Sequence, residues 1–413
     1  MLSSRRYDVV LLGATGFTGT LTARHIHQHT PGSLRWAIAG RSSAKLQNLA
    51  ASLTANQSEK QRPDICIVEL NDKDLQDLAS QTRVIINCIG PYHIYSSGVV
   101  RACAGNGTHY VDASGETPWI QDMITSFDST AKLTGAILVP ETGFESTPSD
   151  VAAFVAASAL HRATKQKSNR ITSVLHKVKG GGMSGGSLAS GLTLVDDYPY
   201  RRVWQMLTDP WMMTPTPHAK PFPNRRSLIS RLLGPFRHSD LGILTTSVTS
   251  PPNMAIVHRS SSLNPGVFDQ VMFSAAEFIR VPTYLAGVLM HVTIMFGMCL
   301  IFLRPFRWLA GKLIPKPGEG PKEDAEDGVE WRALAEVGND GPRALSIFRC
   351  KAGPYHMTAM FMAEVAMTLL QASETILKTH GAGFITPACL GDTYLEHLRA
   401  VGVEISSKVL FGQ

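Results

Sequence analysis

The residues best suited to chemistry form a glycine-rich stretch near the N-terminus, residues 13–19, with the sequence GATGFTG. Gly13 permits a tight turn, Gly16 lets the main chain approach a pyrophosphate, and Gly19 lets a helix pack closely on a strand. Main-chain N–H groups at the start of such a helix bind phosphate oxygens. We therefore expect a dinucleotide to contact Gly13, Ala14, Thr15, Gly16, Phe17, Thr18 and Gly19.

The residues after the second strand pattern predict which dinucleotide binds. NAD-binding folds place an acidic residue there to hold the ribose 2′-hydroxyl, but this chain has Arg41 with Ser42 beside it. A guanidinium pairs well with a phosphate, and the glycine spacing G-x-x-G-x-x-G is common where NADP is preferred. The sequence therefore predicts NADP as the cofactor. The alternatives are a βα turn that binds no ligand at residues 13–19 and, for Arg41, a solvated arginine at the start of a helix.

A proton donor must accompany hydride transfer to a carbonyl, an imine or an enoyl thioester. The apolar run at residues 83–89 ends in Gly90-Pro91-Tyr92. Open α/β sheets bind ligands at the carboxyl ends of their strands. We predict cofactor contacts from Cys88, Ile89 and Gly90. Tyr92 is the first candidate proton donor and Glu116 the second, the alternative for each being a packed or solvated side chain.

The elements that position these groups alternate between strand and helix patterns. Mainly apolar runs at residues 9–12, 34–39, 83–89 and 136–139, the alternating segment 64–70 and the short segment 109–116 predict strands, and helical patterns lie between them. This alternation is typical of a doubly wound parallel sheet. The sequence thus predicts an α/β fold with a Rossmann-type NAD(P)-binding domain over residues 1–150.

Composition limits the function classes. The 413 residues are 44% hydrophobic and only 17% charged, with a formal net charge of +6, whereas about 25% charged is usual. Apolar surface must therefore be hidden in a large core, a partner or a membrane. No basic run with interleaved aromatics is present, which argues against nucleic acid. The six cysteines form no C-x-x-C pair, so we expect a reduced, intracellular protein without a metal site.

An apolar segment in the second half bears on localisation. Residues 284–303 contain no charged residue, and a helix of this length would be about 30 Å long, the thickness of a bilayer core. It could associate with a lipid surface, span a bilayer or be buried as a domain helix. We favour association, because the strand patterns within residues 330–357 should return to the substrate domain.

Several motifs, taken in order, point to a family. GATGFTG, AGR, NCIGPY, DASGE and GFESTPSD are followed by SGGS at residues 184–187, PKPGEGP at 315–321 and TPACLGD at 386–392. The chain resembles the saccharopine dehydrogenase-like oxidoreductases, most closely the branch with bacterial trans-acting enoyl reductases and animal lipid-droplet proteins. GATGFTG also resembles extended short-chain dehydrogenases, but no tyrosine here has the lysine four residues later that those enzymes use.

The resemblance implies an α+β substrate domain over residues 151–357 and C-terminal helices over residues 358–413 that pack back on the Rossmann domain. Within those helices, Glu364 is predicted to be a surface residue, with a pocket carboxylate as the alternative. Thr147 is predicted to cap a helix that continues through Pro148 and Asp150.

These observations predict an NADPH-dependent oxidoreductase, specifically an enoyl reductase acting on the C=C bond of a lipid or polyketide acyl chain. A saccharopine-type imine reductase is one alternative. A membrane-surface or lipid-droplet protein with little catalytic activity is the other. The expected partners are an apolar acyl or polyketide substrate, a membrane or lipid-droplet surface and a second copy of the chain in a homodimer.

Overall fold

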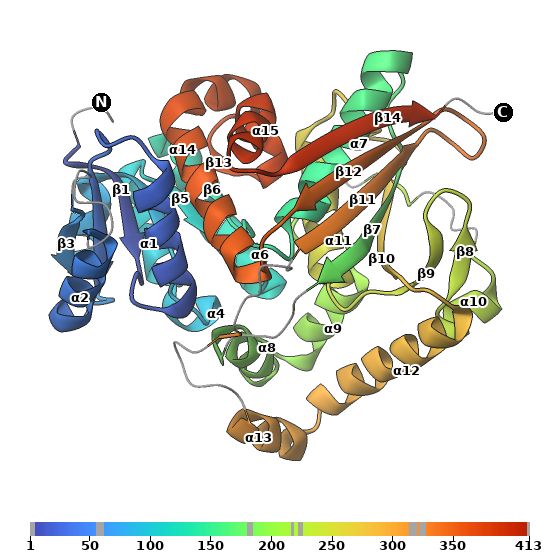
Figure 1. Ribbon diagram of the computed structural model, residues 1–413, viewed down its shortest axis with the longest axis horizontal. Coiled ribbons are helices and arrows are strands. Elements are labelled where there is room, and N and C mark those ends of the chain that lie inside the picture. Colours follow the sequence, from blue (N-terminus) through green and yellow to red (C-terminus); the bar gives the residue numbers. More distant parts are fainter. Residues whose placement is uncertain are drawn as a thin grey trace.

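Two seven-stranded sheets organise the chain (Figure 1). The computed structural model describes residues 5–54, 62–179, 185–215, 219–221, 226–313, 320–321 and 328–410. The first sheet has the order β13-β6-β5-β4-β1-β2-β3, and the second has the order β14-β12-β11-β7-β10-β9-β8.

The first sheet is parallel throughout. Its strands are β1 (Tyr7–Leu12), β2 (Trp36–Gly40), β3 (Asp64–Ile67), β4 (Thr82–Asn87), β5 (His109–Asp112), β6 (Ile137–Val139) and β13 (Gly383–Phe384). Between them run α1 (Phe17–His29), α2 (Ser43–Thr54), α3 (Asp72–Ser80), α4 (Tyr92–Tyr95), α5 (Ser97–Asn106) and α6 (Thr117–Thr134). All six residues of β1 are buried, as expected for a strand covered by helices on both faces. The predicted Rossmann-type α/β fold is confirmed.

The second sheet is mixed. Its strands are β7 (Arg170–Lys179), β8 (Phe236–His238), β9 (Gly242–Thr246), β10 (Ser274–Arg280), β11 (Gly328–Glu336), β12 (Arg343–Cys350) and β14 (Glu404–Leu410). Packed around it are α7 (Thr147–Thr164), α8 (Gly185–Asp197), α9 (Tyr200–Thr208), α10 (Leu228–Leu233), α11 (Ser250–Leu263), α12 (Tyr284–Ile301) and α13 (Arg304–Leu313).

The C-terminal part of the chain touches both sheets. It comprises α14 (Pro354–His380), the 3₁₀-helix η2 (Pro387–Leu390) and α15 (Gly391–Ala400), together with β13 and β14. Helix α14 packs against α1 and β4, β13 pairs with β6, and β14 pairs with β12. One segment therefore ties the two sheets together, while the domain boundaries at residues 150 and 357 stay predictions.

One local prediction was wrong, and one alternative is excluded. Ser146, not Thr147, is the N-cap residue of α7 and makes no side-chain capping bond, while the Asp150 carboxylate accepts hydrogen bonds from Ser260 and from the Ala388 N–H at 2.9 Å. Burial raises the pKa of Asp150 to about 7. The buried-helix alternative for residues 284–303 also fails, because only Gly287 of α12 is buried.

Two of the motifs fall partly outside the described residues. These are the glycine run at residues 180–184 and residues 315–319 of PKPGEGP. The next described residue, Gly320, lies against the ring of Phe17, so close that a Cβ at Gly320 would be 2.3 Å from Phe17 Cε1. The end of this motif therefore contacts the glycine-rich turn.

Candidate active site

The glycine-rich turn after β1 packs directly on the turn after β4. Gly13 has a φ of +79°, in the left-handed region that favours glycine. A Cβ on Gly13 would lie 2.8 Å from Ile89 Cγ1 and 3.0 Å from the carbonyl carbon of Cys88. A Cβ on Gly19 would lie 2.3 Å from the Gly13 carbonyl oxygen. Both glycines are therefore required by the fold itself.

Gly16 differs from the other two glycines of the motif. A Cβ there would meet a single neighbour, the Gly13 carbonyl oxygen, at 3.4 Å. Gly16 is the N-cap residue of α1, it offers no capping side chain, and the first turn of the helix carries no acidic residue. The first N–H groups of a helix lack intrahelical partners, so this end is free to take an anion. The turn thus fits a dinucleotide diphosphate.

The other residues of the motif divide by exposure. Thr15 is exposed and Phe17 and Thr18 are partly exposed, whereas Ala14 and Gly19 are buried. We expect the buried pair to shape the turn and the others to contact the cofactor.

Arg41 follows the carboxyl end of β2 and its side chain is exposed. Its neighbour Ser42 accepts a hydrogen bond from the Lys45 N–H at 3.4 Å. Arg41 has no hydrogen bond or ion pair to another described residue, which leaves its guanidinium available for a 2′-phosphate.

We predict that Arg41→Asp reverses the cofactor preference. Loss of a charge-assisted phosphate contact costs about 1.5–3 kcal/mol, so the Kd for NADPH should rise about tenfold to a hundredfold while that for NADH changes little or falls. Fluorescence titration with both dinucleotides measures this. Equal affinity for both in the wild-type protein would contradict the assignment.

The strand order predicts where the other half of the dinucleotide lies. β1 lies between β2 and β4, and β5 lies on the other side of β4. Arg41 follows β2. A dinucleotide with its 2′-phosphate at Arg41 and its diphosphate at Gly16 must therefore extend its nicotinamide half over the ends of β4 and β5. The predicted contacts Cys88, Ile89 and Gly90 lie there, with Gly90 exposed. Burial raises the pKa of the Cys88 thiol to about 12, which keeps it protonated.

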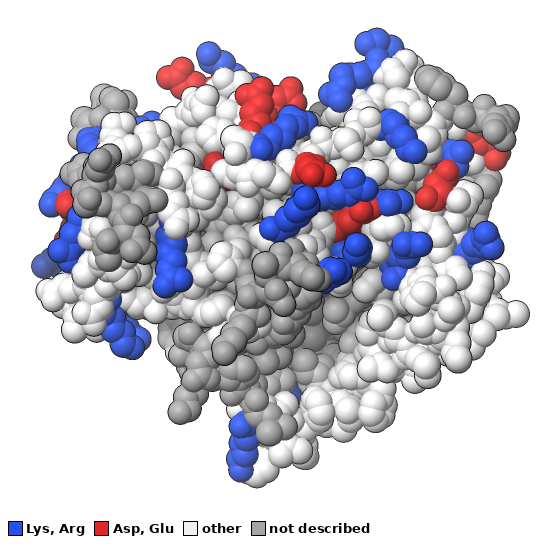
Figure 2. Space-filling model, viewed as in Figure 1, with Lys and Arg blue, Asp and Glu red and all other residues white. Residues whose placement is uncertain are grey.

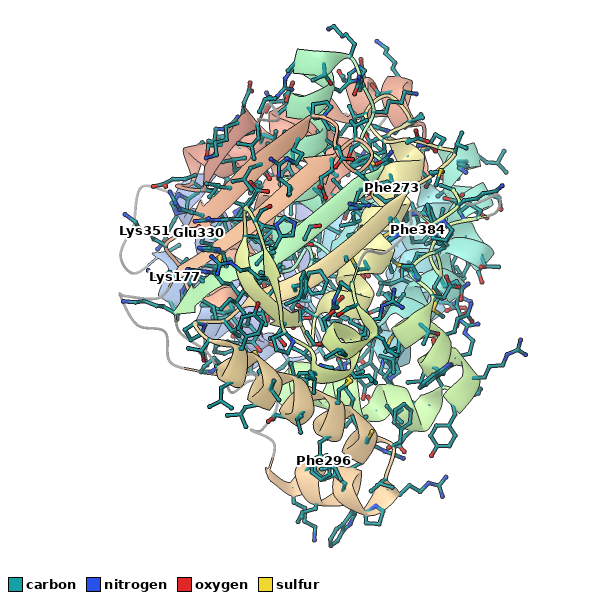
Figure 3. The ribbon with its side chains drawn as sticks, turned by 90° about the vertical axis from the view of Figure 1, so that its right-hand side faces the viewer. Lys177, Phe273, Phe296, Glu330, Lys351 and Phe384 are labelled. Atoms are coloured by element: carbon teal, nitrogen blue, oxygen red, sulfur yellow. The ribbon has the colours of Figure 1, made fainter. Side chains whose placement is uncertain are left out.

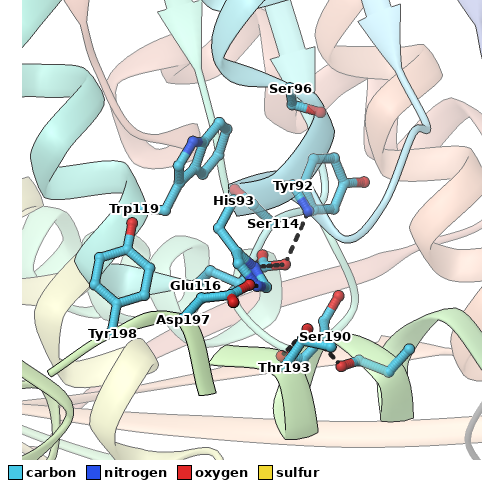
Figure 4. Close-up of polar contacts among 12 residues, drawn as sticks. Tyr92, His93, Ser96, Ser114, Glu116, Trp119, Ser190, Thr193, Asp197 and Tyr198 are labelled. Carbon is cyan, nitrogen blue, oxygen red and sulfur yellow. Dashed lines mark hydrogen bonds and ion pairs between the residues drawn. The ribbon is translucent and has the colours of Figure 1, made fainter. Parts of the chain in front are cut away.

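Tyr92 and Glu116 are adjacent in the structure (Figure 4). Glu116 is buried, and its carboxylate accepts hydrogen bonds from the N–H groups of Tyr92 and Gly115, each at 3.1 Å. The Tyr92 hydroxyl lies 3.4 Å from the carbonyl oxygen of Asn87, to which it donates. Burial, followed by the nearby Cys88 thiol, raises the pKa of Tyr92. The sequence therefore placed both candidates at one sheet edge, and their catalytic role stays a prediction.

A buried network fixes the ends of β4 and β5. Asp112 accepts hydrogen bonds from the Tyr110 hydroxyl at 2.7 Å and from Ser114 at 2.6 Å and 2.9 Å. Asn87 donates to the Tyr110 hydroxyl at 3.0 Å. Burial raises the pKa of Asp112 to about 6 despite these donors. The network holds the strand ends in register beneath the cleft.

Comparisons with known proteins agree with this geometry. A family model described as the saccharopine dehydrogenase NADP binding domain matches residues 9–139. A putative trans-acting enoyl reductase of Mycobacterium tuberculosis is 31% identical, covering 98% of this chain and 98% of its own length. The chain belongs to the saccharopine dehydrogenase-like oxidoreductase family. A trans-acting enoyl reductase of Mycobacterium leprae is 28% identical over 98% of both chains.

The fold of this protein also matches a solved structure. Saccharopine dehydrogenase (L-Glu forming) from Saccharomyces cerevisiae superposes with a TM-score of 0.52 and 14% identity, covering 97% of this chain and 99% of that chain. The two proteins share a fold. Membership of the family makes this chain an NADP-binding oxidoreductase, and NADP(H) is the cofactor that Arg41 favours.

Sequence reasoning missed the Glu141 carboxylate, and it left open a role at the cofactor site for residues 143–146, which include Glu145. Glu141, after β6, is buried with a φ of +58°, and burial followed by repulsion from Asp112 raises its pKa. Glu145 is exposed, yet desolvation and then the charge of Glu116 raise its pKa. A positive φ cannot be predicted from a glutamate, which explains why Glu141 was missed.

A cavity lies away from this edge of the first sheet. It has a volume of about 1550 Å³ and is lined by residues such as Arg226, His238 and Asn339 of the second sheet and its loops. None of the predicted cofactor contacts lines it. This cavity is therefore separate from the candidate active site at the edge of the first sheet.

Proposed function

We propose that this protein is an NADPH-dependent enoyl reductase that saturates the C=C bond of a lipid or polyketide acyl chain. Relatives named trans-acting enoyl reductases align over nearly the whole length of both chains. Their identity of 28–31% supports the reaction type more than the substrate.

The charged residues around the expected nicotinamide position favour a substrate whose reacting atoms carry no charge. The segments that meet there, residues 87–93, 112–116, 141–146 and 190–197, contain no lysine or arginine but include Glu116, Glu145 and Asp197. The arginines near them, Arg202 and Arg307, are paired with Asp122 and Asp196. A saccharopine-type substrate carries several carboxylates and would need cationic partners. An acyl thioester has no charge at its C=C bond and needs none. This charge pattern is the observation that carries the choice between the two reductase alternatives.

Bound NADPH supplies the hydride for such a reduction. The protein's part is to hold the diphosphate on the N–H groups of the turn, to orient the acyl chain over β4 and β5, and to provide a proton. The Glu116 carboxylate accepts a hydrogen bond from the Tyr92 N–H at 3.1 Å and so holds the main chain at Tyr92 in place. Tyr92 and Glu116 remain the candidate donors predicted from the sequence.

An NADPH oxidation assay tests the proposal. We expect turnover with trans-2-enoyl thioesters of long chain length, and none with pairs of an amino acid and a keto acid. Turnover with the second group alone would favour the imine reductase, and no turnover with either would contradict the proposed function.

We further propose that the protein associates with a lipid surface. Helix α12 has a mean hydropathy of 2.0, and only 6% of its residues are buried. It is long and apolar enough to cross a membrane. Together with α10 and α13 it forms what we call the apolar face, on one side of the molecule (Figure 1). Its exposed apolar side chains include Leu228, Ile229, Leu232, Leu285, Leu289, Val292, Phe296, Trp308 and Leu309.

The figures support this arrangement. In Figure 2 the surface at the lower right, over α12, carries no charged residue, whereas lysines and arginines gather over the second sheet. Figure 3 shows Phe296 on the part of α12 remote from that sheet, while Lys177 and Lys351 lie near its edge. Exposed apolar surface of this extent marks a contact site, and Arg304 and Lys312 beside it suit anionic headgroups.

Contacts at each end of α12 favour lying on the surface over spanning. The Thr245 hydroxyl donates to the Gly287 carbonyl oxygen at 2.9 Å, and the Thr246 hydroxyl lies 2.7 Å from His291 Nδ1. Beyond the helix, Arg307 pairs with Asp196 of α8 at 2.6 Å. A helix held to the same domain at both ends cannot cross a bilayer without breaking these contacts.

We predict that the double variant Leu289→Glu/Phe296→Glu loses binding to phosphatidylcholine–phosphatidylglycerol vesicles by about tenfold or more, because two large apolar side chains no longer enter lipid. Co-sedimentation measures the bound fraction. Leu133→Glu is the matched control, since Leu133 is 89% exposed on α6 and outside the apolar face. Unchanged binding of the double variant would exclude the apolar face as the contact.

A further inference from the structure

The imidazole of His93 lies between two carboxylates that come from different parts of the chain (Figure 4). Its Nδ1 is 3.6 Å from Glu116 Oε1, and its Nε2 is 3.2 Å from Asp197 Oδ2 at the end of α8. The side chain is 2% exposed, yet neither ring nitrogen makes an aligned hydrogen bond. Buried polar atoms are normally hydrogen-bonded, so this ring is poised for a further partner.

The position of His93 relative to the strands identifies that partner. His93 belongs to α4, which follows β4, and Glu116 follows β5. These are the two strand ends over which the nicotinamide half is expected. Helix α8 closes the cleft from the second domain, because Ser190 Oγ lies 4.0 Å from the position a Cβ on Gly90 would occupy. His93 therefore sits where a reduced acyl chain would meet the cofactor.

Tyr92 is less suited to reach the same place. Its hydroxyl lies 3.4 Å from the Asn87 carbonyl oxygen and 3.4 Å from the Ala113 N–H, so it points to the strand ends. In Figure 4 the Tyr92 hydroxyl and the His93 ring point in different directions.

We propose that His93 is the catalytic residue that protonates the substrate and that Asp197 is a positioning residue that orients its ring. The inference rests on the proposed function. The β-carbon of the enoyl thioester receives the hydride with its electron pair, and the π electrons shift to the α-carbon and the thioester oxygen. His93 donates its proton to the α-carbon and regains one from water. One NADPH and one proton are consumed for each saturated thioester formed.

Two carboxylates and one aromatic ring surround the His93 imidazole. The groups that face it are Glu116 after β5, Asp197 on α8 and the Tyr198 ring at 6.2 Å between centroids. The nearby Arg202 is paired with Asp122 at 2.7 Å. The proposed step uses the protonated imidazole, in which both ring nitrogens are donors: the N–H facing Asp197 holds the ring, and the other is the proton given to the substrate.

Kinetics of His93→Gln test the catalytic role. With trans-2-dodecenoyl-CoA as the probe, kcat should fall about 10²–10⁴-fold, and the loss of rate at high pH should disappear with it. The KM for NADPH should be unchanged. Asp197→Asn should shift the pH profile with a smaller fall in kcat. His161→Gln, at an exposed site near the end of α7, is the control and should behave as wild type. A kcat of His93→Gln within about threefold of wild type would overturn the proposal.

A binding experiment tests the position of His93 independently of turnover. In protein labelled with ¹⁵N in its imidazoles, the His93 signal is identified by its absence from His93→Gln. NADP⁺ should shift that signal, whereas 2′,5′-ADP, which lacks the nicotinamide half, should not. No shift with NADP⁺ would overturn the placement of His93. If the signal shifts but no enoyl thioester is reduced, the proposed function fails and the catalytic role falls with it, while the placement stands.

Discussion

Gly16→Val is expected to weaken NADPH binding by about a hundredfold or more while leaving the thermal unfolding temperature close to that of the wild type. The reason is that Gly16 adopts φ −74° and ψ 170°, which any residue can adopt, and its missing side chain faces a single protein atom at 3.4 Å. The valine would instead occupy the space for the diphosphate. Losing two charge-assisted hydrogen bonds of about 1.5–3 kcal/mol each gives this magnitude.

Gly19→Ala is the matched control for this prediction. A Cβ there would be 2.3 Å from the Gly13 carbonyl oxygen, so the turn and α1 must shift, at a cost of about 1–3 kcal/mol. We therefore expect a lowered unfolding temperature for Gly19→Ala and a nearly unchanged one for Gly16→Val. If Gly16→Val bound NADPH as tightly as the wild type, the diphosphate could not lie on this turn.

Glu364→Ala is expected to lower the free energy of unfolding by about 3 kcal/mol, because two histidines of neighbouring helices lose the buried carboxylate to which they are hydrogen-bonded. Glu364, on α14, contacts His25 Nε2 of α1 at 2.8 Å and His397 Nδ1 of α15 at 3.0 Å. Urea unfolding measures the change. Glu374→Ala, at an exposed site on the same helix, should change stability little, and a similar loss in both variants would contradict the role of the Glu364 carboxylate.

The same carboxylate makes stability depend on pH. Burial alone would raise the pKa of Glu364, but hydrogen bonds from His25 and His397 hold it below its usual value. The stabilisation is therefore present above the pKa of the unfolded chain and is lost as the pH falls through the folded-state pKa. We expect the difference in stability between wild type and Glu364→Gln to be smaller near pH 4 than near pH 7.

The cofactor half of the molecule could be predicted from local sequence. Alternating strand and helix patterns predicted the doubly wound sheet because its central strand β1 carries an uninterrupted apolar run at residues 9–12, and the glycines and Arg41 follow strands whose ends meet at one edge. Glu364 was harder. It was predicted to be a surface residue, which is wrong because it is buried, and its partners His25 and His397 lie far away in the sequence.

The substrate half could not be predicted in the same way. Asp197 reaches His93 from a helix more than a hundred residues away in the chain, and no local pattern encodes that pairing. The apolar composition of α12 could not show whether the helix is buried or exposed, because both kinds of helix share that composition. Only the packing of α12 against β9 shows which face is left open.

Transfer of label from NADPH deuterated at the nicotinamide C4 position tests the central claim most directly. With a long-chain trans-2-enoyl thioester, we predict a saturated product carrying one deuterium at the β-carbon, detected by mass spectrometry, and no labelled product with Gly16→Val. Unlabelled thioester after complete incubation, with deuterium appearing instead in the product of an amino-acid and keto-acid pair, would contradict the account.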